Sequence, residues 1–334
     1  MADDCYLTKE IAVRLDHNLS HASQVGRVQL FFLRVTQNPY ITLDAAVYDG
    51  FQLPFEKLYM PEIFGFDAFA PKEIAERVEN VGVAKVRLPL LAMLMLGVLA
   101  GAFIGLGALF YVLVISDPTL GFALSRVIGG VVFSLGLILV VVAGAELFTG
   151  NNLLAMAWAD GKISTTELLR NWSIVCSANF VGAAGLALLV FLSRHAEMNN
   201  GLIAEQYLKI AAVKCAMPFA TAFFKGVLCN VLVCLAVWMA MAGRSIMDKA
   251  VAIVFPISAF VAAGFEHSIA NMYIIPLGML LKAAGNHPAY SDAISWSGFL
   301  HNLVAVVLGN LTGGSVLVAL VYFVIYRRNT HNIS

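Results

Sequence analysis

Six stretches of the chain are apolar over about 20 residues or more, and this feature limits the possible folds more than any other. They cover residues 88–115, 124–148, 171–192, 219–242, 250–281 and 299–325. A helix needs about 20 apolar residues to cross the roughly 30 Å of hydrocarbon in a bilayer. Only 13% of the residues are charged, about half the share found in soluble domains. The sequence therefore predicts an all-α membrane protein with six transmembrane helices.

Two of these stretches carry polar residues where an uninterrupted span would be apolar. The second ends in a polar segment with Glu146, Thr149 and Asn151, and the fifth has Glu266 and His267 in its middle. Irregular backbone at membrane depth is tolerated only inside protein or beside a water-filled cavity. We therefore expect both helices to be broken, with the breaks facing a cavity.

The two polar segments also share a pattern. The sequence Gly-x-Glu-x-x-x-x-Asn runs from Gly144 to Asn151 and again from Gly264 to Asn271, 120 residues later. A second matching pair lies in the third and sixth stretches: Asn179-Phe-Val-Gly182 and Asn310-Leu-Thr-Gly313. The first three spans, over about residues 88–193, therefore recur as the last three, over about residues 217–325. An odd number of spans in each copy predicts inverted repeats, with a substrate path where the two broken helices meet.

The distribution of Lys and Arg predicts the orientation of the chain, because cytoplasmic loops carry the excess of these residues. One side of the predicted bundle receives ten of them: Lys72, Arg77, Lys85, Arg87, Lys162, Arg170, Arg244, Lys249, Arg327 and Arg328. The other side receives five: Arg126, Arg194, Lys209, Lys214 and Lys282. We therefore expect a multi-pass protein of the cell's inner (plasma) membrane with both termini in the cytoplasm.

Four segments follow from these patterns. Residues 1–70 are expected to form an N-terminal cytoplasmic extension to which the sequence assigns no role. Residues 71–87 have apolar residues at helical spacing among charges, which predicts an amphipathic interfacial helix. The six-span domain covers residues 88–328, and residues 329–334 form a cytoplasmic tail.

The five cysteines indicate neither a disulfide framework nor a metal site. None of them forms a Cys-x-x-Cys pair, and their odd number and scattered positions do not fit a zinc site. The formal net charge is zero, so the composition gives no indication of nucleic-acid binding. We expect no cofactor and no metal.

Five motifs resemble those of the formate/nitrite transporter family, and the resemblance covers about residues 71–328. They are Phe133-Ser-Leu-Gly-Leu137, Gly144-Ala-Glu-Leu-Phe-Thr-Gly-Asn151, Lys225-Gly-Val-Leu-Cys-Asn230-Val-Leu-Val-Cys-Leu-Ala-Val-Trp238, Gly243-Arg-Ser-Ile-Met-Asp-Lys249 and Gly264-Phe-Glu-His-Ser-Ile-Ala-Asn-Met-Tyr273. The resemblance implies an aquaporin-like fold, assembled as a homopentamer with one pore in each protomer. It also implies transport of a small monovalent anion, with formate as the first choice. A nitrite transporter and a hydrosulfide channel of the same family remain alternatives.

The resemblance also assigns roles to individual residues. The central pore residues are Thr149 and His267, the apolar constrictions are Phe133, Leu137 and Phe260, and the periplasmic vestibule holds Lys214 and Asn230. At the two breaks, structural roles are expected for Glu146, Asn151, Glu266 and Asn271, because a carboxylate in the path would repel an anion.

An apolar constriction predicts how the anion passes. A bare ion costs far more free energy there than a small neutral acid does. We expect Lys214 to attract the anion, which is then protonated near His267 and crosses as the neutral acid.

Two other classes of function predict motifs that this sequence lacks. A neutral-solute channel of the aquaporin type would carry Asn-Pro-Ala at both breaks. An intramembrane enzyme would need a nucleophile with a base, paired aspartates or a His-Glu-x-x-His zinc motif. The sequence has none of these motifs, so we expect a transporter and not an enzyme.

Overall fold

The computed structural model describes residues 32–34, 42–44, 68–285 and 292–328. The chain divides into two units, Met1–Phe66 and Asp67–Ser334. In the first unit, strand β1 (Phe32–Arg34) pairs antiparallel with β2 (Thr42–Asp44). Most of the predicted extension 1–70 and the whole of the tail 329–334 lie outside the described residues.

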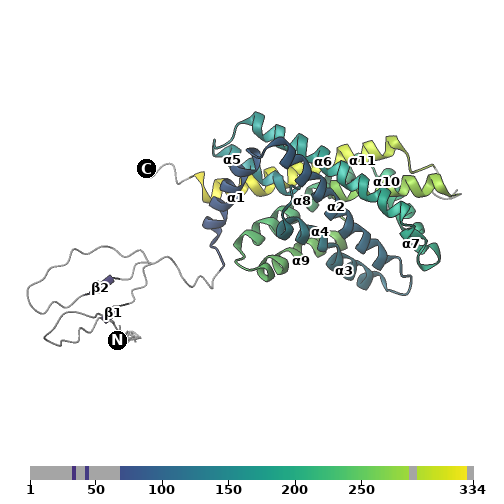
Figure 1. Ribbon diagram of the computed structural model, residues 1–334, viewed down its shortest axis with the longest axis horizontal. Coiled ribbons are helices and arrows are strands. Elements are labelled where there is room, and N and C mark those ends of the chain that lie inside the picture. Colours follow the sequence, from purple (N-terminus) through teal and green to yellow (C-terminus); the bar gives the residue numbers. More distant parts are fainter. Residues whose placement is uncertain (1–31, 35–41, 45–67, 286–291, 329–334) are drawn as a thin grey trace, which may run out of the picture. The chain divides into compact units, whose positions relative to one another are not determined.

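The described part of the second unit is helical, and Figure 1 shows its helices packed side by side. The elements before the middle of the chain are α1 (Pro71–Val86), α2 (Leu90–Ile115), α3 (Phe122–Phe133), α4 (Leu135–Ile138), the π-helical turn η1 (Leu139–Gly144), η2 (Gly150–Leu153), α5 (Leu154–Ala159) and α6 (Thr165–Leu192). They are followed by η3 (His195–Glu197), η4 (Asn199–Gly201), α7 (Leu202–Cys215), α8 (Phe219–Ala242), α9 (Ile246–Ala263), α10 (Ser268–Ala284), α11 (Trp296–Leu311), η6 (Thr312–Leu320) and α12 (Val321–Tyr326).

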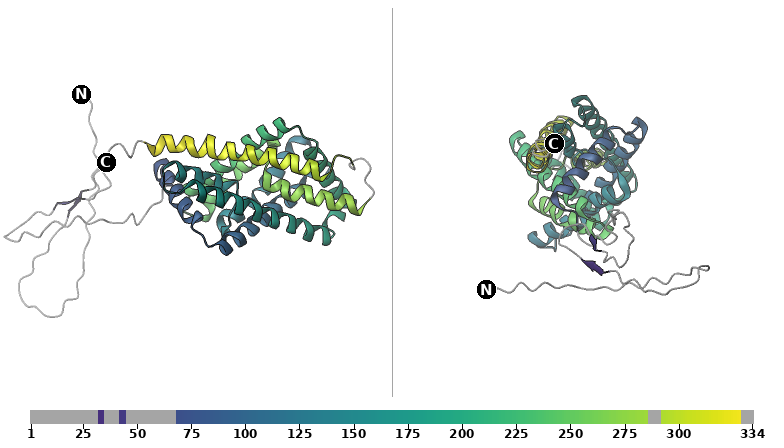
Figure 2. Two further views of the ribbon diagram at one scale, coloured as in Figure 1. Left: turned by 90° about the horizontal axis from the view of Figure 1, so that it is seen from above. Right: turned by 90° about the vertical axis from the view of Figure 1, so that its left-hand side faces the viewer.

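Six of the described helical segments are long and apolar enough to cross a bilayer. They are Leu90–Ile115, Phe122–Gly144, Thr165–Leu192, Phe219–Ala242, Ile246–Ala263 and Trp296–Tyr326. Each overlaps one of the six predicted stretches, so the prediction of a multi-pass, all-α membrane protein is confirmed. The last segment, formed by α11, η6 and α12, runs along the bundle as one long rod (yellow in Figure 2).

One boundary differs from the sequence prediction for an identifiable reason. The third span begins at Thr165 and not at residue 171, because Ser164 and Glu167 form a capping box that starts the helix earlier. The fifth predicted stretch, 250–281, is divided between α9, which ends at Ala263, and α10, which begins at Ser268.

Helix α1 occupies the predicted amphipathic segment. Pro71 stands at its first turn, where a missing N–H costs nothing. Its buried side chains include Ile74 and Val78, which share an apolar cluster with Met156 and Trp238. The apolar stripe of α1 therefore faces the other helices of the same unit.

Glycines allow two pairs of helices to approach closely. On the α2–α6 contact, Gly101 faces the carbonyl of Asn179, and Gly182 faces that of Val98. On the α8–α11 contact, Gly309 faces the carbonyl of Phe223. A β-carbon at any of these glycines would overlap a backbone atom of the neighbouring helix. Small residues at helix contacts are the usual way in which membrane helices pack closely.

The helical backbone is interrupted at the two polar segments. No helix is assigned to residues 145–149, between η1 and η2, or to residues 264–267, between α9 and α10. Gly144 precedes the first segment with φ of 86°, and Gly264 begins the second with φ of 74°. Glycine adopts this left-handed conformation without steric cost, which makes it a common helix C-terminus.

Candidate functional site

The two interruptions meet at Thr149 and His267. Both residues are buried, and Thr149 Oγ1 lies 3.1 Å from His267 Nε2. The residues come from segments 118 positions apart in the chain. The sequence prediction placed both at the centre of the pore, and the structure brings them into direct contact.

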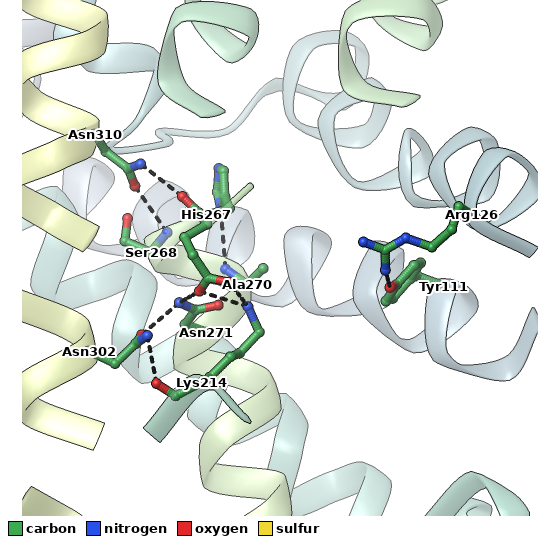
Figure 3. Close-up of polar contacts among 10 residues, drawn as sticks. Tyr111, Arg126, Lys214, His267, Ser268, Ala270, Asn271, Asn302 and Asn310 are labelled. Carbon is green, nitrogen blue, oxygen red and sulfur yellow. Dashed lines mark hydrogen bonds and ion pairs between the residues drawn. The ribbon is translucent and has the colours of Figure 1, made fainter. Parts of the chain in front are cut away.

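The backbone of α10 defines the hydrogen bonding of the His267 ring. His267 is the N-cap of α10, and its Nδ1 accepts a hydrogen bond of 3.2 Å from the backbone N–H of Ala270 (Figure 3). A nitrogen that accepts carries no proton, so a neutral ring has its proton on Nε2. In this tautomer, Nε2–H donates to Thr149 Oγ1, and the Thr149 hydroxyl is free to donate to another acceptor.

Aromatic side chains lie against this pair. The Phe133 and Phe260 rings meet edge to face with their centroids 5.7 Å apart. The Phe260 ring also stacks on the His267 ring at 5.9 Å. Both phenylalanines and Leu137 are buried, so an apolar barrier adjoins the histidine.

A cavity of about 290 Å³ opens on one side of this barrier. Phe133, Phe260 and His267 form part of its wall. Its charged lining residues are Arg126, Lys209, Lys214, Lys225 and Glu266. We call it the Lys214 cavity. Four basic residues and one acidic residue give this space an excess of positive charge.

Lys214 is bound to the second interruption by an ion pair. Its Nζ lies 2.9 and 2.8 Å from the two carboxylate oxygens of Glu266. Asn271 donates to the same carboxylate at 2.7 Å and to Asn302 Oδ1 at 2.8 Å. Asn302 in turn donates to the Lys214 carbonyl at 3.0 Å (Figure 3). The Glu266 carboxylate therefore holds the lysine and the asparagine in place.

A second cavity, of about 750 Å³, has Leu137 in its wall and also contains Lys85, Glu146 and Asn151. We call it the Lys85 cavity. Lys85 Nζ donates to Glu146 at 2.8 Å and to Asn151 Oδ1 at 2.9 Å. Asn151 donates to Glu146 at 2.7 Å and to Asn171 Oδ1 at 3.0 Å. This network has the same residue types as the one around Lys214.

Lys85 entered the sequence prediction only as a marker of orientation, and its place in this network was not predicted. One signal could have found it. Lys85 precedes Gly97 by 12 residues, as Lys214 precedes Gly226. Asn171 and Asn302, also missed, are 131 positions apart, as are Asn179 and Asn310.

Two asparagines satisfy the backbone groups that the interruptions free. Asn179 donates to the carbonyls of Gly97 and Glu146 and accepts from the Phe148 N–H. Asn310 donates to the carbonyls of Gly226 and Glu266 and accepts from the Ser268 N–H. A backbone polar group left unpaired in an apolar setting costs several kcal/mol, so these bonds stabilise the irregular segments.

Asn230, which the sequence prediction assigned to the periplasmic vestibule, is not among the residues that line the Lys214 cavity. It is buried on α8 and donates to Asn152 Oδ1 at 2.8 Å and to the carbonyls of Thr149 and Asn310 at 3.2 and 2.8 Å. Asn230 thus joins the first interruption to α11.

Metal-binding chemistry is not indicated in the part of the chain that the structure describes. No three His, Cys, Asp or Glu side chains within it are grouped to hold an ion. The chemical groups at the site are an imidazole, a hydroxyl, two ion-paired lysines and apolar rings. These groups suit binding and proton exchange with a small anion.

Known proteins with similar sequences include several channels. The chain is 40% identical over 279 residues to "Formate channel FocA" of Escherichia coli K12, a match that covers 80% of this chain and 98% of FocA. It is 41% identical over 264 residues to "Uncharacterized transporter YrhG" of Bacillus subtilis, covering 77% and 94% of the two chains.

The solved structures that resemble this chain also include channels. An "FNT family ion channel" superposes with a TM-score of 0.68 at 31% identity and covers 76% of this chain and 98% of its own. A "Pentameric formate channel with formate bound" has a TM-score of 0.66 at 37% identity and covers 71% and 97%. Residues 72–324 also match the sequence profile of the formate/nitrite transporters. The chain therefore belongs to the formate/nitrite transporter family.

Proposed function

We propose that this protein transports a small monovalent anion, formate first, through a path that joins the Lys85 and Lys214 cavities. The observation that carries the proposal is the arrangement of two cation-bearing cavities around an apolar barrier at which Thr149 and His267 meet. A relative that is named as a formate channel, and a similar solved channel with formate bound, both support formate as the substrate.

We further propose that the fold is built from two inverted repeats with a broken helix in each. The support is the match between the two polar networks. Lys85 corresponds to Lys214 at an offset of 129 residues, and Glu146 and Asn151 correspond to Glu266 and Asn271 at an offset of 120. The paired interruptions and glycine contacts follow the same order along the chain. In an inverted repeat the two networks would face opposite sides of the membrane.

In this proposal the anion loses its charge before it crosses the apolar barrier. Positive residues in a cavity raise the local concentration of anions. The Phe133–Phe260 contact disfavours a bare ion much more than a neutral acid. We propose that the anion takes up a proton from water in the Lys214 cavity, where this cavity reaches His267, crosses the barrier as the neutral acid and releases the proton on the far side. The Thr149 hydroxyl donates a hydrogen bond to the acid while the Nε2–H of His267 donates to Thr149 Oγ1.

The hydrogen bond at Nδ1 constrains this step. A ring that donates a whole proton must first be protonated on Nδ1 as well, which displaces the N–H of Ala270. Losing a helix cap costs about 1 kcal/mol, so a proton transfer from the ring costs more free energy than hydrogen bonding from the ring does.

The assembly and placement of the protein are further parts of the proposal. The pentameric formate channel supports a homopentamer. The excess of Lys and Arg on one side supports an inner-membrane protein with both termini in the cytoplasm. The Lys214 cavity would then face the outside, and the Lys85 cavity the cytoplasm.

Uptake of labelled formate into proteoliposomes tests the proposal. Formate, nitrite and hydrosulfide are supplied separately at equal concentration, with protein-free liposomes as the control. Formate uptake well above the control, and faster than that of the other two, is the expected result. Faster nitrite or hydrosulfide uptake would instead favour one of the two alternatives in the same family. Uptake equal to that of protein-free liposomes for all three would contradict the transport function.

A further inference from the structure

Arg126 lies in the wall of the Lys214 cavity but has no role in the mechanism so far. It belongs to α3, which also carries Phe133. Its Nη1 donates to the Tyr111 hydroxyl at 3.0 Å (Figure 3). Its Nε donates to the carbonyl of Ala262 at 3.1 Å. These two bonds fix the guanidinium between α2, α3 and the end of α9. Helices α3 and α9 also supply Phe133 and Phe260 of the apolar barrier.

The charge of Arg126 is less neutralised than that of Lys214. Lys214 binds both carboxylate oxygens of Glu266, which cancels most of its charge at short range. Within the described residues, no carboxylate lies within ion-pair distance of Arg126. An anion that enters the cavity therefore meets a fixed, unpaired positive charge at Arg126.

Arg126 also changes the electrostatics of the helix end beside it. Helix α9 ends at Ala263, and the C-terminal carbonyls of a helix carry partial negative charge that repels anions. The guanidinium covers this end. Gly264 makes room for it, because a β-carbon on Gly264 would stand 2.6 Å from Arg126 Nη2.

The guanidinium keeps donors for a ligand. It has five N–H groups in a planar fork, and its bonds to Ala262 and Tyr111 use two of them. Such a fork matches the two oxygens of a carboxylate, which a lysine ammonium cannot do. We propose that Arg126 is the residue on which a small planar oxyanion, a carboxylate or nitrite, docks in the Lys214 cavity before it reaches the aromatic barrier. This inference rests on the proposed transport function.

The kinetics of formate entry from each side test this role. Initial uptake rates are measured in right-side-out and inverted membrane vesicles for the wild type, Arg126→Gln and Lys209→Gln. Lys209 is the matched control, because it is an exposed basic residue of the same cavity and its substitution removes the same charge.

A docking role predicts a change of KM on one side only. Arg126→Gln should raise the KM for entry from the Lys214 side about tenfold, as expected for the loss of a charge-assisted hydrogen bond, with less than about a twofold change in Vmax from that side. The KM for entry from the opposite side should change less than about twofold. The Vmax for entry from the opposite side should fall by the same factor of about ten, because a passive path has the same Vmax/KM in both directions at equal pH and zero membrane potential. Lys209→Gln should raise the KM by less than about twofold.

Two results would overturn the inference while the transport function stands. One is an unchanged KM in Arg126→Gln, and the other is an equal increase in Arg126→Gln and Lys209→Gln, which would mean that only the net field of the cavity matters. A wild type that moves no formate would contradict the transport function itself. If Arg126→Gln does not assemble, Arg126→Lys decides the question. It keeps the charge but loses the fork, so docking predicts a raised KM with little change in Vmax, and an unchanged KM refutes docking.

Discussion

The ion pair between Lys214 and Glu266 gives a prediction whose magnitude follows from its burial. The two side chains are 12% and 5% exposed, so substituting one leaves the other charge in a site with little water. Breaking a buried pair in this way costs about 3–5 kcal/mol. We expect Lys214→Met to lower the Tm of the purified protein by on the order of 10 °C. The unpaired Glu266 carboxylate should also repel the anion and slow formate uptake.

The double variant distinguishes the effect of breaking the ion pair from the effect of losing one side chain. Lys214→Met combined with Glu266→Gln removes both charges, so the buried carboxylate is no longer unpaired. Tm is followed by loss of monodisperse protein after heating in detergent, together with initial formate uptake in proteoliposomes. The double variant should be more stable than Lys214→Met alone. If the decreases in Tm of the two single variants simply add up in the double variant, the residues are not coupled and this reasoning is refuted.

Three further predictions concern packing, the central hydroxyl and pH. Gly182→Ala should prevent normal assembly, seen as loss of the intact peak in size-exclusion chromatography, whereas Gly185→Ala on the same helix should not, because no other described element of the same chain comes within 4 Å of a β-carbon there. Thr149→Val should slow formate uptake about tenfold by removing the hydroxyl that contacts His267, and Thr149→Ser should restore most of it. Burial raises the pKa of Glu79 on α1 above 4.5, so the folded state binds this proton more tightly than the unfolded state does, and stability should fall as pH rises through the range just above 4.5. Glu79→Gln should flatten this part of a Tm-against-pH curve, and an unchanged slope would contradict the assignment to Glu79.

The sequence was sufficient to predict the six spans and the positions of the interruptions. Long apolar stretches leave few alternatives to spanning helices, and the repeated Gly-x-Glu pattern marked both irregular segments. The amphipathic helix α1 was equally readable, because its apolar stripe at Ile74 and Val78 has helical spacing. These features depend on residues close together in the chain.

The contacts around the site were harder to predict. Lys85 pairs with Glu146 across 61 positions, and the sequence pattern pointed to Lys85 only as a marker of orientation. Asn230 was expected in the vestibule, and no local pattern predicts that its amide reaches Thr149 and Asn310, where α8 packs closely against α11. Phe133 and Phe260 are indistinguishable from core residues until the Phe260 ring is seen stacked on His267 and the Phe133 ring against Phe260. The family resemblance, and not local spacing, singled them out.

The central claim is that the His267 ring takes part in moving the anion, and one variant tests it directly. His267→Asn removes the ring, while the Asn side-chain oxygen can still cap α10 by accepting from the Ala270 N–H. Labelled formate uptake into proteoliposomes is measured from about pH 5 to 8 for the wild type and His267→Asn, after intact assembly of both is shown by size-exclusion chromatography. The account predicts that uptake by the wild type depends on external pH and that His267→Asn loses this dependence. A correctly assembled His267→Asn with the rate and pH profile of the wild type would show that the histidine only caps the helix, and the account would be contradicted.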